Sequence, residues 1–213
     1  MSGHRAGDAV DGRRVVLWRH GETAWNAQDR FQGTTDVELT AGGLAQARAS
    51  ARTLASYGPD TIIASDLKRA AATAAELAAF LGVPVTHDEG LREAYAGQWQ
   101  GLTFHEIREN FSEEYAKWRR GESVRRGGGE LDTEVAARAG RVVRRHVEEL
   151  CDGGTLVVVT HGGTIRALTG SLLGLDPSWW MSLHGLGNCG WRVLNVSGGR
   201  WRLDGSEPAI LES

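Results

Sequence analysis

The chain of 213 residues contains only two cysteines, Cys151 and Cys189, which are far apart in the sequence. Neither lies in a C-x-x-C pair or at metal-ligand spacing, so the sequence argues against a disulfide-stabilised secreted domain and fits a reducing compartment. No apolar run approaches the ~20 residues of a membrane span, and no apolar segment of signal-peptide length stands near the start. These absences predict a cytoplasmic protein that does not bind a membrane.

A surplus of charge of one sign is also missing, because 24 lysines and arginines nearly balance 27 aspartates and glutamates, for a net charge of -3. The chain is therefore not a general polycation that would bind nucleic acid or anionic lipid, and any anion site has to come from local clustering. The sequence has no Walker loop, no dinucleotide-binding fingerprint and no cluster of metal ligands. We expect no nucleic-acid partner, no cofactor and no metal ion.

What the sequence does contain is an alternation of short β-branched runs with segments of helical periodicity. Strands are predicted over residues 14–18, 61–65, 83–86 and 155–160, with a closing hairpin over 189–195 and 200–203. Helices are predicted over residues 41–56, 70–81, 104–119, 134–150 and 164–173. This order predicts an α/β protein, a three-layer α/β/α sandwich with a mainly parallel central sheet. The length suits a single domain, residues 14–213, after a flexible leader, residues 1–13.

Three of the predicted strands end in motifs that carry chemically useful side chains. These motifs are Arg19-His20-Gly21, Ser65-Asp66-Leu67-Lys68-Arg69 and Thr160-His161-Gly162-Gly163. Because the carboxyl ends of parallel strands meet at one edge of a sheet, we expect two histidines and two arginines to converge there. A neutral imidazole is a competent nucleophile, and guanidinium groups match phosphoryl oxygens bidentately. Each residue alone has a plain structural explanation, but their joint occurrence predicts phosphate-ester chemistry.

The first motif extends to Leu17-Trp18-Arg19-His20-Gly21-Glu22-Thr23-Ala24-Trp25-Asn26, which resembles the signature of the histidine phosphatase superfamily in its phosphoglycerate mutase-like branch. The resemblance continues in family order through several further segments. They are Arg30–Gly33, Ser65–Ala70, Leu91–Glu93, Gly97–Gly101 and Thr160–Gly163. The similarity spans roughly residues 14–196, and it implies a phosphoglycerate mutase-like fold.

The resemblance also implies a role for each matching residue. His20 would attack phosphorus and become a phosphohistidine, while Arg19, Arg69 and His161 would bind the phosphoryl group. Glu93 would give a proton to the leaving oxygen and later deprotonate the water that hydrolyses the phosphoenzyme. Further positions would line the phosphate pocket, namely Asn26, Gln32, Gly33 and Gly162. Arginines would supply the positive charge that metal ions supply elsewhere, so we expect metal-independent activity.

The implied function is a phosphatase that acts on a small phosphorylated metabolite, and family habit suggests a homodimer. The far end of the chain, Leu186–Trp191 with Trp201–Leu203, looks most like glucosyl-3-phosphoglycerate phosphatases. Two alternatives stay open: a phosphoglycerate mutase, and a non-catalytic module that binds a phosphorylated ligand. The arginine pairs in segment 119–126 either recognise a second anionic group or form a solvated basic loop. Gly128-Gly129-Glu130 resembles a family segment, but Leu131 replaces its usual serine, so no substrate role is assigned there.

Overall fold

The computed structural model describes residues 12–207, so the predicted leader, residues 1–13, lies outside the described residues except for its last two positions. The described strands form a six-stranded sheet in the order β3-β2-β4-β1-β5-β6. The strands are β1 (Arg13–Arg19), β2 (Thr61–Ala64), β3 (Val85–His87), β4 (Thr155–Thr160), β5 (Trp191–Ser197) and β6 (Arg200–Glu207). Strands β1 to β4 pair in parallel, whereas β5 and β6 are antiparallel. The predicted, mainly parallel sheet with its closing hairpin is confirmed.

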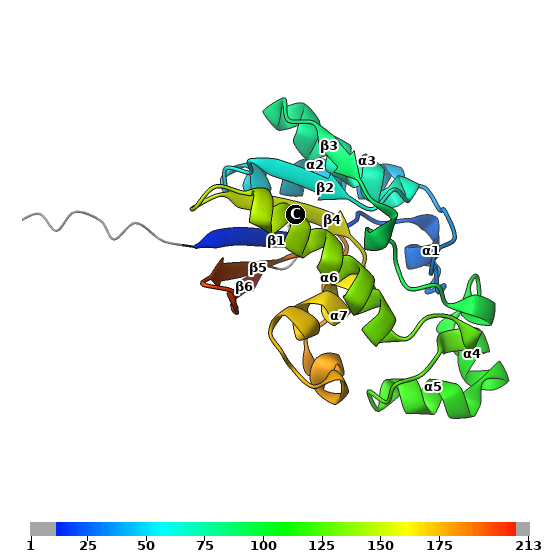
Figure 1. Ribbon diagram of the computed structural model, residues 1–213. Coiled ribbons are helices and arrows are strands. Elements are labelled where there is room, and N and C mark those ends of the chain that lie inside the picture. The colour runs from blue at the N-terminus through cyan, green and yellow to red at the C-terminus, as the bar shows by residue number, and fades with distance from the viewer. Residues whose placement is uncertain (1–11, 208–213) are drawn as a thin grey trace, which may run out of the picture.

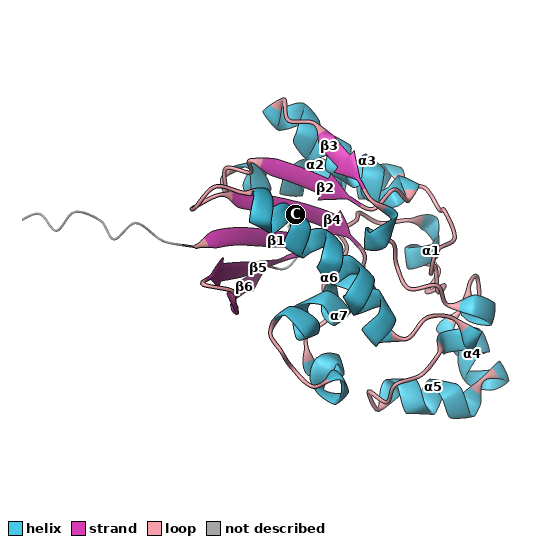
Figure 2. Cartoon of the chain, in the orientation of Figure 1, coloured by secondary structure: helices cyan, strands magenta, loops and turns pink. Residues whose placement is uncertain are grey.

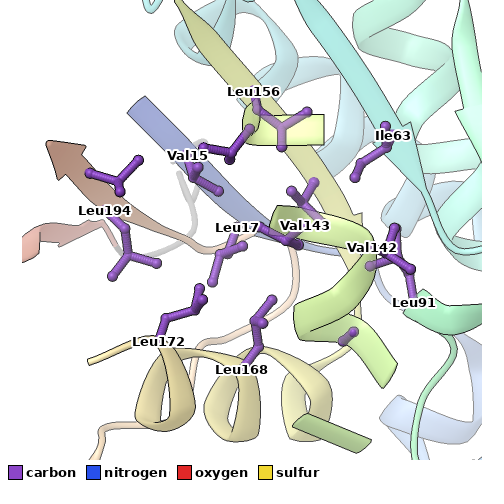
Figure 3. Close-up of a cluster of buried hydrophobic side chains, with 14 of the residues drawn as sticks. Val15, Leu17, Ile63, Leu91, Val142, Val143, Leu156, Leu168, Leu172 and Leu194 are labelled. Carbon is purple, nitrogen blue, oxygen red and sulfur yellow. The ribbon is translucent and has the colours of Figure 1, made fainter. Parts of the chain in front are cut away.

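Helices cover both faces of this sheet, as Figures 1 and 2 show. On one side lie α2 (Ala41–Ala55) and α3 (Lys68–Leu81), and on the other lie α6 (Asp132–Glu149) and α7 (Gly162–Leu172). Successive residues of a strand point to opposite faces. Val15 and Leu17 of β1 therefore join the cluster with α6 and α7 that Figure 3 shows, while Val16 and Trp18 pack with α2 and α3. This is the expected three-layer sandwich.

The segment 104–119 differs from its prediction as one continuous helix. It forms two helices, α4 (Phe104–Asn110) and α5 (Ser112–Arg119), which are separated at Phe111, where φ is -133° and ψ is 43°. The bend brings Phe111, Tyr115 and Trp118 around the buried ring of Trp99. Helical periodicity alone does not reveal such a bend, because tertiary packing of the aromatic rings decides it. Both helices lie beyond the carboxyl ends of the parallel strands (Figure 1).

The loop that follows β1 is pressed directly against the start of α2. A Cβ atom on Gly21 would overlap the carbonyl oxygen of Gly43, and one on Gly43 would overlap the backbone of Glu22. Thr40 caps α2 by accepting a hydrogen bond from the Gly43 N–H, and Thr73 of α3 accepts one from the Gly21 N–H. The backbone around residue 21 is thus held by two helices, and glycine at both contact positions permits that approach.

Two further sequence predictions concern membrane spans and the state of the cysteines. Across residues 12–207, no helix is long and apolar enough to cross a membrane. Cys151 is exposed and Cys189 is buried, and both are free thiols.

We expect Leu17→Ala to lower the free energy of unfolding by about 2–5 kcal/mol, because Leu17 is fully buried in the central strand and its truncation leaves a cavity. Urea unfolding followed by circular dichroism measures this change. Leu203→Ala, at a side chain that is 44% exposed on β6, is the matched control and should cost far less. Equal losses in the two variants would contradict the placement of the core.

Candidate active site

His20 follows the last residue of β1, and its side chain is only 3% exposed. Its Nδ1 lies 2.7 Å from the carbonyl oxygen of Gly21. A carbonyl oxygen only accepts, so Nδ1 carries the proton and the other ring nitrogen, Nε2, keeps its lone pair. The loop after β1 therefore selects the tautomer that a nucleophilic imidazole requires.

The electrostatic surroundings keep the His20 ring neutral. Burial lowers its pKa well below 6.5, and the positive charges of Arg69 and Arg19 lower it further. Both effects penalise the imidazolium form. At neutral pH, His20 is consequently an uncharged nitrogen base next to two cations.

Asn188 fixes the backbone on which His20 stands. Its side-chain Nδ2 donates to the carbonyl oxygens of His20 at 3.2 Å and Gly21 at 3.1 Å, and to Oδ1 of Asn26 at 3.1 Å. The Cys189 N–H also donates to the His20 carbonyl oxygen, at 3.1 Å. Asn26, predicted to line the pocket, does line the cavity described below, and its Oδ1 is already engaged by Asn188. Motif reasoning assigned no role to Asn188, and only its place in the segment that resembled known phosphatases pointed to it.

Arg69 stands in the first turn of α3 and is completely buried. Its guanidinium donates to the carbonyl oxygens of Gly33 and Thr35, at 2.8 Å each, and its Nε donates to Nδ1 of His161 at 3.2 Å. Burial lowers the pKa of Arg69 to about 10, so it remains protonated at neutral pH. The carbonyl contacts hold the planar group in one orientation.

His161 lies behind Arg69 rather than at the cavity surface. Because its Nδ1 accepts from Arg69, its Nε2 carries the proton and donates to Oγ of Ser65, at 2.9 Å. The rings of His161 and His20 are 5.2 Å apart between centroids. Burial, with the charge of Arg69, lowers the pKa of His161 well below 6.5. Sequence reasoning expected His161 to bind phosphoryl oxygens directly; in this structure both of its nitrogens are engaged by protein, and it orients Arg69.

Arg19, the last residue of β1, also lines the cavity that contains His20 and Arg69. One Nη donates to the carbonyl oxygen of Leu186 at 2.5 Å, while the buried Nε has no hydrogen-bond partner within residues 12–207. A Cβ on Gly162 would lie 3.4 Å from this Nε, so the first residue of α7 leaves the guanidinium accessible. An unpaired buried donor is costly unless a ligand satisfies it.

Glu93 caps the N-terminus of α7. Its carboxylate accepts from the N–H groups of Gly163 at 2.9 Å, Thr164 at 3.0 Å and Ala94 at 2.9 Å, and from the Thr164 hydroxyl at 3.1 Å. Burial alone would raise the pKa of this carboxyl. The Ala94 hydrogen bond and the positive charge of Arg126, joined by the Gly163 hydrogen bond, outweigh burial and lower the pKa below 4.5. The unliganded site therefore holds Glu93 as a carboxylate.

The loop that carries Glu93 is anchored to α6. Arg138 donates to the carbonyl oxygens of Arg92 at 2.7 Å and Glu93 at 3.0 Å, and its Nε pairs with Glu130 at 2.9 Å. Glu130 also accepts from the Tyr95 N–H at 2.8 Å. The Gly-Gly-Glu segment, to which no role was assigned from sequence, thus positions the Glu93 loop.

Gln32 and Gly33 belong to a loop that a second motif segment holds in place. Gly33 has a left-handed φ of 55°, and a Cβ there would overlap the side chain of Gln100. Gln100 accepts from the Thr34 N–H at 2.8 Å. Gln32 is 8% exposed, and its Oε1 has no partner within the described part of the chain. Gln100 thus supports the loop whose Gly33 and Thr35 carbonyl oxygens hold Arg69.

These residues surround a cavity of about 480 Å³ at the carboxyl ends of the parallel strands. Predicted residues that line it are Arg19, His20, Asn26, Gln32, Gly33, Arg69, Glu93 and Gly162; His161 does not. Four additional arginines line it as well, namely Arg30, Arg119, Arg126 and Arg166. Helical spacing offered a signal for Arg166, because it follows Gly162 by four residues on α7 and so lies on the same face.

Part of the arginine-rich segment is packed rather than solvated. Arg126 is 4% exposed and pairs with Asp132, and its guanidinium lies 5.7 Å from the centre of the Phe31 ring. Arg120 and Arg125 instead pair with Glu122 and with Glu134. The alternative of a solvated basic loop over segment 119–126 is therefore wrong at Arg126, which is buried against Phe31, a residue far away in the sequence. In the region that the structure describes, no three His, Cys, Asp or Glu residues are grouped as metal ligands.

Comparison with known proteins identifies the family of this chain. The sequence model of the histidine phosphatase superfamily (branch 1) matches residues 15–207. The glucosyl-3-phosphoglycerate phosphatase of Mycolicibacterium vanbaalenii is 39% identical over 206 residues, covering 94% of this chain and 90% of that protein. The 2,3-bisphosphoglycerate-dependent phosphoglycerate mutase 2 of Gloeobacter violaceus is 38% identical over 168 residues, covering 76% and 77%.

Among solved structures, the mycobacterial glucosyl-3-phosphoglycerate phosphatase in complex with VO3 has a TM-score of 0.88 and 38% identity. The match covers 92% of this chain and 99% of that one. The resemblance inferred from the sequence motifs and the predicted fold are both confirmed.

The two buried neutral histidines make stability fall in mild acid. Above pH 6.5 they are neutral in both states; below it the unfolded chain protonates them while the folded chain, with both pKa values lowered, does not. Between pH 6.5 and 4.5 the free energy of unfolding should therefore fall, by at most about 2.7 kcal/mol per pH unit for two protons. Urea unfolding at a series of pH values measures the slope. His20→Ala should roughly halve it, and an unchanged slope in that variant would contradict the lowered pKa.

Proposed function

Because this chain belongs to the histidine phosphatase superfamily, we propose that it hydrolyses phosphate monoesters of a small metabolite through a phosphohistidine at Nε2 of His20. The observation that carries the proposal is the Nδ1 contact of His20 with the Gly21 carbonyl oxygen, which leaves a neutral, unprotonated Nε2 at the cavity that Arg19 and Arg69 line. A nucleophile needs its lone pair free when substrate arrives. We also propose a cytoplasmic site of action, because two cysteines far apart in the sequence fit a reducing compartment.

The arginines bind and polarise the phosphoryl group. Arg19 has an unsatisfied buried Nε, and Arg69 is fixed by Gly33 and Thr35, so both charges are in place before substrate binds. Preorganised cations stabilise the charge of the phosphoryl transition state without reorganisation during reaction. His161 acts as a positioning residue through Arg69.

Glu93 donates a proton to the leaving oxygen and later accepts one from water. When Nε2 of His20 forms its bond to phosphorus, the ester P–O bond breaks and the leaving oxygen takes a proton from Glu93. Water then attacks phosphorus, the N–P bond breaks, and Glu93 receives the proton that the water loses. Since the free site holds Glu93 ionised, the first proton arrives with the substrate phosphate, whose second pKa is about 6. The negative charge of bound phosphate opposes the arginines and raises the proton affinity of Glu93.

The remaining arginines select a substrate with a second anionic group. Arg126 and Arg166 line the cavity, and the buried Nε of each has no hydrogen-bond partner among residues 12–207. A single phosphate dianion does not require these charges in addition to Arg19 and Arg69. A carboxylate near the phosphate matches them, as in glucosyl-3-phosphoglycerate, the substrate in the names of the phosphatase relatives. We take this sugar phosphate as the substrate of the chain.

Phosphate release from a panel of glucosyl-3-phosphoglycerate, 3-phosphoglycerate and fructose bisphosphates tests this function. Wild type in EDTA should release phosphate, with the highest kcat/KM for glucosyl-3-phosphoglycerate, and His20→Ala should lose at least 1000-fold, a loss of about 4 kcal/mol in transition-state stabilisation. Isomerised phosphoglycerate without free phosphate would instead support a mutase. Binding without turnover would support a ligand-binding module, and loss of activity in EDTA with recovery in Mg²⁺ would overturn the metal-independent mechanism.

Glu93→Gln should affect substrates according to their leaving groups. An alkyl phosphate releases a strongly basic oxygen that needs the proton, whereas p-nitrophenyl phosphate releases a stable anion. We expect kcat for the alkyl ester to fall about 100-fold or more. The rate constant of phosphoenzyme formation from p-nitrophenyl phosphate, measured from the burst of p-nitrophenol, should change far less. Equal losses in both would show that Glu93 does not protonate the leaving group.

A further inference from the structure

One wall of the cavity differs chemically from the arginine-rich part. Asp29, Phe104 and Trp118 line the cavity around His20, and the same three residues, with Arg119, also line an adjoining cavity of about 560 Å³. We infer that this wall is a glycosyl subsite, which binds the neutral sugar ring of the substrate while its anionic groups lie with the arginines. The inference rests on the proposed function, and it assigns residues to the part of the substrate that the phosphoryl machinery leaves unexplained.

The two aromatic rings form a surface suited to a sugar. The planes of Phe104 and Trp118 are inclined by only 3°, with centroids 6.2 Å apart, and Phe104 is 38% exposed. The face of a pyranose ring presents C–H groups, which pack favourably on the electron-rich face of an aromatic ring. Trp118 makes edge contacts with Phe31 and with the buried ring of Trp99, and these contacts fix the position of the aromatic surface.

Asp29 supplies the hydrogen-bond acceptors that a sugar needs. It follows α1 (Ala24–Ala27) and its cap Gln28, at a position where φ is 52° and glycine is usual. Aspartate tolerates this left-handed conformation better than most residues other than glycine, and its exposed carboxylate makes no hydrogen bond or ion pair with any residue of 12–207. A carboxylate accepts from two hydroxyl groups at once. Because no protein group pairs with this carboxylate, it is available to accept hydrogen bonds from the hydroxyl groups of a ligand.

The charges fix the orientation of the substrate in the cavity. The carboxylate of a phosphoglycerate is attracted to Arg126 and Arg166 and repelled by Asp29. A neutral polyol is not repelled by Asp29, and its hydroxyl groups donate to it. Arg119 lines both cavities, and its side chain makes no hydrogen bond or ion pair in the described part of the chain, so its guanidinium can donate where the two cavities meet.

The test compares two substrates that differ only in the sugar. Asp29→Gly removes the carboxylate at a backbone conformation that glycine prefers, and Phe104→Leu removes the aromatic face on a partly exposed position. For each variant, kcat/KM is measured on glucosyl-3-phosphoglycerate and on 3-phosphoglycerate. We expect kcat/KM for glucosyl-3-phosphoglycerate divided by kcat/KM for 3-phosphoglycerate to fall at least fivefold in each variant. Glu113→Gln, an exposed carboxylate on α5 that lines neither cavity, is the control and should leave the ratio unchanged.

An unchanged ratio in either variant, including an equal loss on both substrates, overturns the glycosyl subsite and leaves the phosphatase proposal intact. A different result addresses the proposed function itself. If wild type releases phosphate from other esters but not from glucosyl-3-phosphoglycerate, the substrate proposal fails and the subsite fails with it. Thermal unfolding of each variant accompanies the kinetics, and a variant with the wild-type Tm and a lowered ratio supports the subsite.

Discussion

The burial of Arg19 and Arg69 beside two imidazoles is the interaction on which the rest of the site depends. Burial of cations normally requires nearby counter-charge, and here the buried carboxylate that acts on both is Glu93. Burial, together with the same charges, holds His20 and His161 neutral. The unliganded site is thus electrostatically incomplete, and a phosphoryl group supplies the missing negative charge. Affinity and nucleophilicity come from one arrangement.

Helix α7 links the acid and the phosphoryl site. The N–H groups of its second and third residues, Gly163 and Thr164, donate to the Glu93 carboxylate, while Gly162, its first residue, lies next to the guanidinium of Arg19. The positive end of the helix dipole therefore stabilises the Glu93 carboxylate before substrate binds, and it also faces the substrate phosphate after binding. Proton transfer at Glu93 and charge at phosphorus change together, because both face the same helix end.

The sequence predicted the parallel strands and the motifs at their ends, since β-branched runs and Arg-His-Gly or His-Gly-Gly segments are local signals. It did not reveal the bend at Phe111, which packing around Trp99 determines. It did not reveal that Arg138 holds the Glu93 loop or that Asn188 holds the loop of His20, because these contacts join residues far apart in the chain. Such anchoring residues have no spacing rule, so only the three-dimensional structure identifies them.

The backbone contact between Gly21 and Gly43 joins the nucleophile loop to the first turn of α2 without any intervening side chain. In such a backbone contact no side chain can change its rotamer to compensate for a movement of either segment. Fraying of the first turn of α2 would move the carbonyl oxygen of Gly21, and with it the tautomer of His20. The chemical competence of the nucleophile is therefore tied to local opening of a helix that contributes no catalytic side chain. Local opening of the first turn of α2 would therefore lower activity while the sheet is still folded.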